Sequence, residues 1–124
     1  MTNAASRPET SSAQASGPTD LAAWLGSEIG LLERRLQGQG PMCRLDRQAT
    51  GAVALKADEG RYALLRRVAR LLERGEPLSR ALEAEAAKSA ALLASDSAVA
   101  RDPLWRAYHE AVLAAIAQLR ERLG

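Results

Sequence analysis

Apolar side chains recur every three or four residues along four stretches of this 124-residue chain, and that spacing is the period of an amphipathic α-helix. The last stretch has the cleanest stripe, formed by Leu104, Tyr108, Ala111, Val112, Ala115, Ile116 and Leu119. Leu and Ala supply most apolar positions, Phe is absent, and the chain has two Trp and two Tyr. Because Leu and Ala favour helices and aromatic residues favour strands, the sequence predicts an all-α fold.

The breaks between these stretches predict helices over about 20–37, 44–74, 79–94 and 103–123. Gly75 and Pro77 end the second helix, and Ser79 is expected to cap the third. Asp102 is a suitable N-cap for the last helix, with Pro103 at its first position. Short connections favour antiparallel neighbours, so we expect a small up-and-down bundle of about four helices. A helix hairpin completed by dimerisation is the alternative architecture.

Residues 1–18 have no apolar periodicity and are rich in Ser, Ala, Thr and Pro. Such a segment buries too little apolar area to offset its conformational entropy, so we expect a disordered tail. Residues 19–124 are then expected to form a single helical domain, which is long enough to bury a core without disulfides or metals.

The segment 42–60 has the weakest pattern in the chain. Residues 52–55 (AVAL) would suit a short strand, but the apolar spacing across the whole segment also fits a helix. Gly51 and Gly60 interrupt that helical pattern. We favour a helix, with a bend near Gly60 as one form of it.

The first predicted helix carries two charged residues among its leucines. Glu28 and Arg35 share the apolar face, where a polar group needs a partner. The simpler interpretation is an ion pair between the two, or a position at the edge of the buried face. The alternative is a polar contact with another subunit or a ligand. The pocket candidates under that alternative are Glu28, Arg35, Tyr108 and His109.

An arginine stripe follows the second predicted helix. Arg66, Arg70 and Arg74 recur at four-residue spacing, and Arg67 lies beside them. Guanidinium groups in a row can bind phosphates or acidic side chains, which makes these four residues candidates for partner or anion binding. A solvated charged face is the simpler interpretation, because Glu73 interrupts the stripe and no aromatic residues are interleaved for base stacking.

Two single residues are weaker candidates for chemistry. His109 is the only histidine and lies at the boundary of an apolar stripe, beside Tyr108 and Trp105. We expect it to be packed and singly hydrogen-bonded, not a base or ligand. No metal-ligand spacing such as His-x-x-x-His occurs, so we expect no metal and no cofactor. Cys43 is a candidate reactive thiol, because the neighbouring Arg44 can lower its pKa, although most lone cysteines are small apolar residues.

The chain has no phosphate-binding loop, dinucleotide-binding glycine pattern or nucleophile elbow, which disfavours an enzyme. The first predicted helix has a small-residue face with Gly26 and Gly30 at the GxxxG spacing. Together with an Ala-rich third helix, it offers more packing surface than one core uses. We expect a non-enzymatic helical protein acting through protein–protein contacts, as a homodimer or as an accessory or regulatory subunit. The alternatives are a small-ligand-binding protein or enzyme subunit using the polar pocket, and a nucleic-acid binder using the arginine stripe.

The sequence also bears on location. Neither a signal peptide nor a transit peptide is readable, and the longest strongly apolar stretch, 111–117, is too short to span a bilayer of roughly 30 Å. With one cysteine in the chain, we expect a soluble, cytoplasmic protein. The preference for Arg over Lys indicates a GC-rich coding sequence and a bacterial source. A net charge of +2 is too small to indicate a polyanionic partner, so nucleic acid is the least favoured partner class.

Overall fold

The computed structural model describes residues 18–39 and 49–124. The helices in these ranges are α2 (Pro18–Gln39), α3 (Ala49–Glu73), α4 (Ser79–Ala94), α5 (Ala98–Arg101) and α6 (Pro103–Leu123). The described part of the chain contains no strand, so the all-α prediction is confirmed. Residues 1–17 of the predicted 1–18 tail, the segment 42–48 and Cys43 lie outside the described residues, and Pro18 is the first residue of α2.

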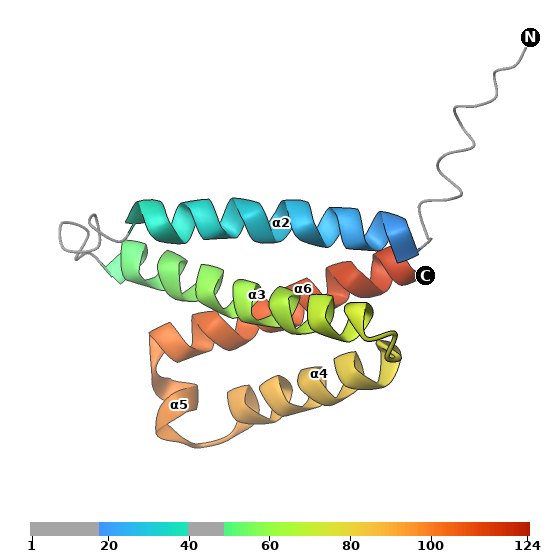
Figure 1. Cartoon of the computed structure of the whole chain (residues 1–124). Helices are drawn as coiled ribbons and strands as arrows, with labels where there is room; N and C mark the ends of the chain where they lie inside the picture. The colour runs from blue at the N-terminus through green and yellow to red at the C-terminus, as the bar shows by residue number, and fades with distance from the viewer. Residues whose placement is uncertain (1–17, 40–48) are drawn as a thin grey trace, which may run out of the picture.

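The four long helices run alternately in opposite directions, as the predicted up-and-down bundle requires (Figure 1). Helices α3 and α6 pack along each other at the centre. Helix α2 packs on α3, and α4 packs on α6, so these two helices lie on opposite sides of the central pair (Figure 1). The beginning of α2 and the end of α6 share one end of the bundle, where Arg122 Nη2 is 3.6 Å from Asp20 Oδ2.

The core is built from aliphatic side chains of all four long helices. Its buried members are Leu21, Leu25, Leu32, Leu64, Leu65, Val68, Leu82, Val112, Ala115, Ile116 and Leu119. Full burial of a Leu, Ile or Val side chain contributes about 1.5–3 kcal/mol. Helix α4 contributes one residue to this cluster, Leu82, so its attachment to the bundle depends less on aliphatic burial than that of α2, α3 or α6.

The ends of α3 and α6 are set by the local signals that the sequence predicts. Gly75 has a φ of 70°, and its N–H donates to Leu72 O at 3.0 Å while Glu76 N–H donates to Leu71 O at 2.9 Å. This is the Schellman pattern of a glycine-terminated helix. At the start of α6, Asp102 Oδ1 accepts a hydrogen bond from Leu104 N at 2.8 Å, which confirms the predicted cap.

The predicted cap at Ser79 is wrong. The residue before α4 is Leu78, which already has helical dihedral angles and makes no side-chain capping bond. Leu82 N–H donates to Leu78 O at 2.8 Å, so the helical hydrogen bonds already begin at Leu78. Ser79 therefore lies inside the first turn and is not the N-cap. The short helix α5 is not predicted either. Ser97 Oγ starts it by accepting from Ala100 N at 3.1 Å.

Residues 49–60 belong to α3, so the helix favoured for this part of the ambiguous segment is confirmed and the strand at 52–55 is wrong. The helix continues through Gly60, and the reason for glycine there is contact with α6. A Cβ at Gly60 would collide with the carbonyl oxygen of Tyr108 and lie 3.0 Å from its carbonyl carbon. Gly60 therefore permits a close approach of α3 to α6.

Replacing Gly60 with alanine tests this close approach. We expect Gly60→Ala to lower the free energy of unfolding by about 1–3 kcal/mol, because the added methyl group forces the two central helices apart. Gly26→Ala is the matched control, since no atom of another described helix lies within 4 Å of a Cβ there, and alanine should raise the free energy of unfolding by up to about 1 kcal/mol. Urea unfolding followed by circular dichroism at low protein concentration measures both. A stabilising Gly60→Ala would contradict the packing argument.

Candidate functional site

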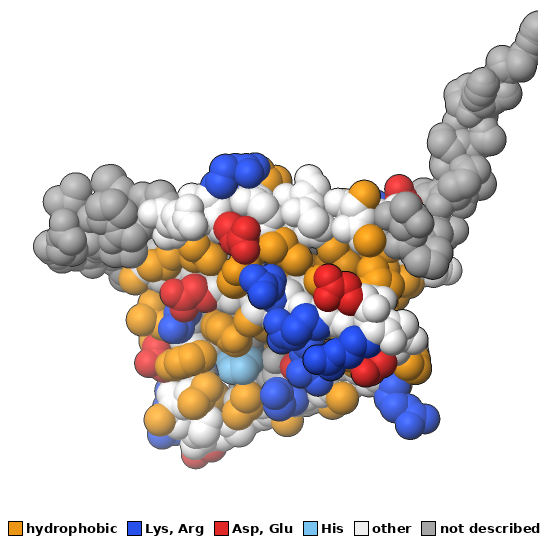
Figure 2. Space-filling view, viewed as in Figure 1, with side chains coloured by type: hydrophobic (Ala, Val, Ile, Leu, Met, Phe, Trp, Pro, Cys, Tyr) orange, Lys and Arg blue, Asp and Glu red, His pale blue; other side chains and the backbone are white. Residues whose placement is uncertain are grey.

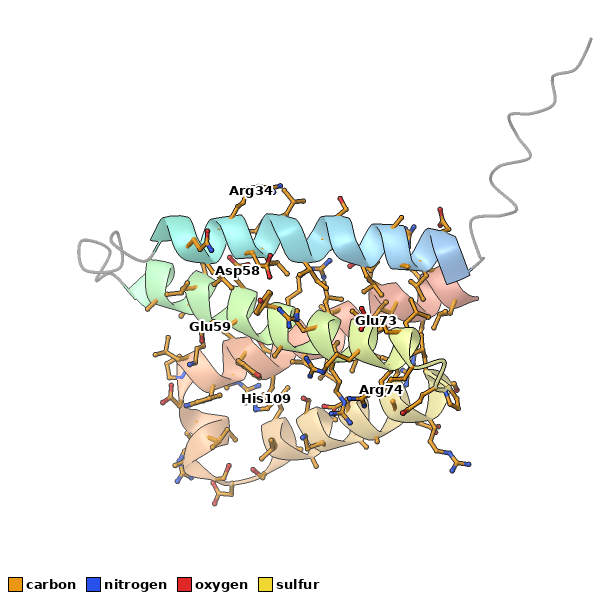
Figure 3. All side chains as sticks on the ribbon, viewed as in Figure 1. Arg34, Asp58, Glu59, Glu73, Arg74 and His109 are labelled. Atoms are coloured by element: carbon orange, nitrogen blue, oxygen red, sulfur yellow. The ribbon has the colours of Figure 1, made fainter. Side chains whose placement is uncertain are left out.

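The two charged residues on the apolar face of α2 are paired with α3, not with each other. Glu28 Oε1 accepts a hydrogen bond from Arg61 Nη2 at 2.9 Å. Arg35 binds Asp58 through two hydrogen bonds, Nε to Oδ2 at 3.2 Å and Nη2 to Oδ1 at 2.8 Å. Of the two simpler interpretations, the mutual ion pair is wrong, because both side chains lean across to the neighbouring helix. The position at the edge of the buried face is what the structure has, since the Glu28 side chain is 28% exposed and that of Arg35 51%. Figure 3 shows Asp58 in this position between α2 and α3.

These pairs form a seam of charges along the α2–α3 contact, at the margin of the core. Glu33 extends the seam, since its Oε2 accepts from Tyr62 Oη at 2.9 Å. The hydrogen bonds from Arg35 to Asp58 raise the pKa of the Arg35 guanidinium above its usual value. The seam satisfies polar groups that would otherwise border a leucine core, and it fixes how α2 lies on α3.

The strength of the seam can be measured by a double-mutant cycle on Arg35→Gln and Asp58→Asn. We expect a coupling free energy of about 0.5–1 kcal/mol, because the Arg35 side chain is 51% exposed and solvent screens the pair. The coupling should decrease in high salt. Strictly additive effects of the two substitutions would show that the pair contributes nothing to stability.

The four arginines of the stripe have different surroundings in the structure. Arg66 turns toward α2, with Nη1 3.0 Å from Tyr62 Oη and 3.6 Å from Glu33 Oε2. Arg67 turns toward α4, where its Nε is 3.1 Å from Glu85 Oε2. Arg70 and Arg74 have no carboxylate within 4.0 Å among the described residues. Figure 2 shows Lys and Arg side chains gathered on one face of the molecule.

A basic cleft lies between α3, α4 and α6. Its volume is about 260 Å³, and it is lined by Ala63, Leu64, Arg67, Arg70, Glu85, Lys88, Ser89, Tyr108, His109 and Val112. We call this the α3–α4–α6 cleft. It brings two of the four stripe arginines, Arg67 and Arg70, together with the two pocket candidates on α6, and it adds Lys88 and Ser89 from α4.

The histidine of this cleft is packed and hydrogen-bonded. His109 is 9% exposed and Ser89 is 2% exposed, and His109 Nδ1 lies 3.0 Å from Ser89 Oγ. The rings of Tyr108 and Trp105 lie 5.1 Å and 6.2 Å from the imidazole, centroid to centroid. Burial, and then the positive charge of Lys88, lower the pKa of His109 below its usual value, so the imidazole is neutral near pH 7.

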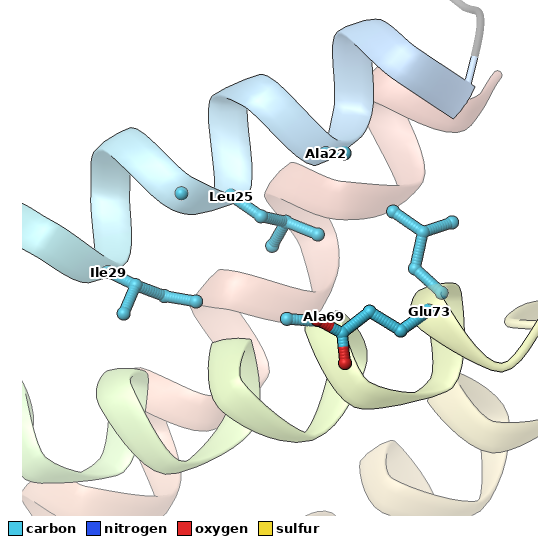
Figure 4. Close-up of a pocket in the computed structure, with 7 residues that line it drawn as sticks. Ala22, Leu25, Ile29, Ala69 and Glu73 are labelled. Atoms are coloured by element: carbon cyan, nitrogen blue, oxygen red, sulfur yellow. The ribbon is translucent and has the colours of Figure 1, made fainter.

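A second concavity is apolar and lies between α2 and α3. It is lined by Ala22, Leu25, Gly26, Ile29, Ala69, Leu72 and Glu73, and its volume is about 420 Å³ (Figure 4). We call it the α2–α3 groove. It continues onto the outer surface of α2, where Ala22, Ala23, Gly26 and Ser27 are exposed.

The structure does not bring the four pocket candidates together. Glu28 and Arg35 belong to the seam between α2 and α3, whereas Tyr108 and His109 line the cleft on the other side of α3. Sequence reasoning missed Lys88 and Ser89. A signal for Ser89 was present, because it lies at helical spacing between Leu82, Ala86 and Leu93, and a polar residue on an apolar stripe needs a partner.

Comparison with known proteins finds no matching family, no similar curated protein and no similar solved structure. Within residues 18–39 and 49–124, no three His, Cys, Asp or Glu side chains gather in a way that could hold a metal ion. No helix of the same ranges combines the length and apolar character that a bilayer span requires. The features of the described residues that bear on function are therefore the two concavities and their side chains.

The buried neutral His109 predicts a loss of stability in mild acid. The unfolded chain binds a proton at His109 at a higher pH than the folded chain does, so the free energy of unfolding should fall as the pH drops below about 6.5 and through the folded-state pKa. His109→Gln removes this titration. Urea unfolding between about pH 7.5 and pH 5 should therefore show a shallower decline for the variant. The same decline in both proteins would mean that other groups cause it.

Proposed function

We propose that this protein is a non-enzymatic interaction module that forms a homodimer through α2, with α2 of the second copy packing over Gly26 and the α2–α3 groove. The observation that carries the proposal is Gly26. This glycine lies in the middle of α2 and lines the groove. Apart from its chain neighbours and the nearby backbone of α2, no atom of the described residues lies within 4 Å of a Cβ built on it. A helix-interior glycine lowers stability by about 1 kcal/mol relative to alanine. Close approach of a second helix is a physical use for that glycine.

The comparison with Gly60 supports this interpretation. Gly60 allows a neighbouring helix of the same chain to approach, whereas the side of α2 that carries Gly26 and Gly30 meets no other helix of the described residues. Among the described residues, and apart from the nearby backbone of α2, the only atom within 4 Å of a Cβ on Gly30 is Nη1 of Arg34, on the same helix, at 3.7 Å. A surface of small residues next to an apolar groove suits helix–helix packing at short distance.

A second copy is the occupant that we propose, because α2 carries both parts of a symmetric contact. In a twofold interface the same patch must act on both subunits. The groove is lined in part by α2, and the small exposed residues Ala22, Ala23, Gly26 and Ser27 of the same helix lie next to it. The single cysteine is in keeping with a cytoplasmic setting, which is part of this proposal.

The test is a leucine at the centre of the proposed contact. Gly26→Leu should weaken self-association at least about tenfold, because the introduced side chain fills the groove or holds the second helix away. Ala84→Leu is the matched control, since it adds the same apolar side chain at an exposed position of α4. Sedimentation velocity from micromolar to millimolar concentration measures the equilibrium, and circular dichroism checks that both variants keep their helices.

Two outcomes would overturn the proposal. A wild-type chain that stays monomeric over the whole concentration range leaves no dimer to explain. A dimer that Gly26→Leu and Ala84→Leu affect equally would place the contact elsewhere on the molecule.

A further inference from the structure

The charges around the α3–α4–α6 cleft are unbalanced. Three cations line it, Arg67, Arg70 and Lys88, against one carboxylate, Glu85. Glu85 is shared, since its oxygens lie 3.1 Å from Arg67 Nε and 3.9 Å from Lys88 Nζ. Arg70 has no carboxylate within 4.0 Å among the described residues. The cleft therefore has a positive excess, and a guanidinium at its wall has its donors available.

Neutral hydrogen-bonding groups complete this lining. Ser89 and His109 are buried, line the cleft and contact each other at 3.0 Å. When His109 Nδ1 carries the proton and donates it to Ser89 Oγ, the serine hydroxyl hydrogen is left to donate to a third group. A cationic wall and a hydroxyl donor on one cleft form the set of groups that oxyanions bind.

We propose that the α3–α4–α6 cleft binds a small phosphate-bearing anion, with Arg70 as its main charged ligand and Ser89 as a hydrogen-bond donor. The volume of about 260 Å³ is below the roughly 300–1,000 Å³ of sites for drug-sized ligands, so the cleft suits a single phosphate group or a compact phosphomonoester. This site is separate from the α2–α3 groove, and it does not depend on self-association.

The single histidine makes the proposal measurable without labelling. The charged and titratable groups around His109 are Arg67 and Arg70 of α3, Glu85 and Lys88 of α4, and Tyr108 of α6. An anion bound among them stabilises the protonated imidazole, so it raises the pKa of His109. The ring protons of one histidine give an assigned signal in a proton NMR spectrum of the full chain.

The experiment titrates the protein with inorganic phosphate and follows the His109 signal as a function of pH. We expect a saturable change in the ring signal and a higher pKa of His109 in phosphate than in sodium chloride of the same ionic strength. Identical responses to phosphate and chloride would overturn the proposal, because they would reflect screening alone. An equal or stronger response to acetate would overturn the assignment to phosphate.

Arg70→Gln and Arg74→Gln form a matched pair for this titration. Both remove one positive charge from neighbouring turns of α3, but Arg70 lines the cleft and Arg74 does not. We expect Arg70→Gln to weaken phosphate binding about tenfold or more and Arg74→Gln to leave it within about twofold. Equal losses in the two variants would show a general charge effect and overturn the site. Gly26→Leu should bind phosphate as the wild type does, which separates this test from that of the dimer.

Discussion

The close contact between α3 and α6 is the interaction on which the rest of the bundle depends. These two helices pack along each other at the centre, and α2 and α4 each attach to one of them. The contact is close because Gly60 has no side chain where α3 meets the backbone of Tyr108. A larger residue there would separate the helices that supply Leu64, Leu65, Ile116 and Leu119 to the core. Close-packed interiors accommodate such separation poorly.

The two outer helices attach in different ways, and this difference creates the two concavities. Helix α2 combines buried leucines with the seam of ion pairs to α3, so one side of it is fixed and the other side is left with small exposed residues. Helix α4 has one aliphatic core residue, Leu82, and a polar contact through Ser89 and His109. The basic cleft lies where α3 and α4 make few aliphatic contacts with each other.

The positions of the arginines follow from the same arrangement. The spacing of the stripe along α3 made its four members equivalent, but α2 and α4 lie on different sides of that helix. Arg66 pairs with Glu33 of α2, and Arg67 pairs with Glu85 of α4. Arg70 is left facing the cleft and Arg74 lies beyond it. The four arginines resemble one charged surface in the sequence, but they divide in the structure. Arg66 and Arg67 form contacts between helices, whereas Arg70 and Arg74 are two further cations.

The sequence by itself determined the helices, because their periodicity and end signals are local. The stripe of α6, the glycine end at Gly75 and the cap at Asp102 depend on residues within one or two turns of each other. Local signals failed at Ser79 and at α5, where one residue of backbone geometry decides the helix start.

Only the tertiary structure decided the partners across helices. The pairing of Glu28 with Arg61 and of Arg35 with Asp58, the contact of Gly60 with α6, and the meeting of Ser89 with His109 join residues about 20 to 50 positions apart in the chain. Periodicity specifies which face of a helix is buried, but not the neighbour or the register against which it packs. The candidate sites consist of such long-range contacts, so the sequence supplied their residue types and the fold supplied their combination.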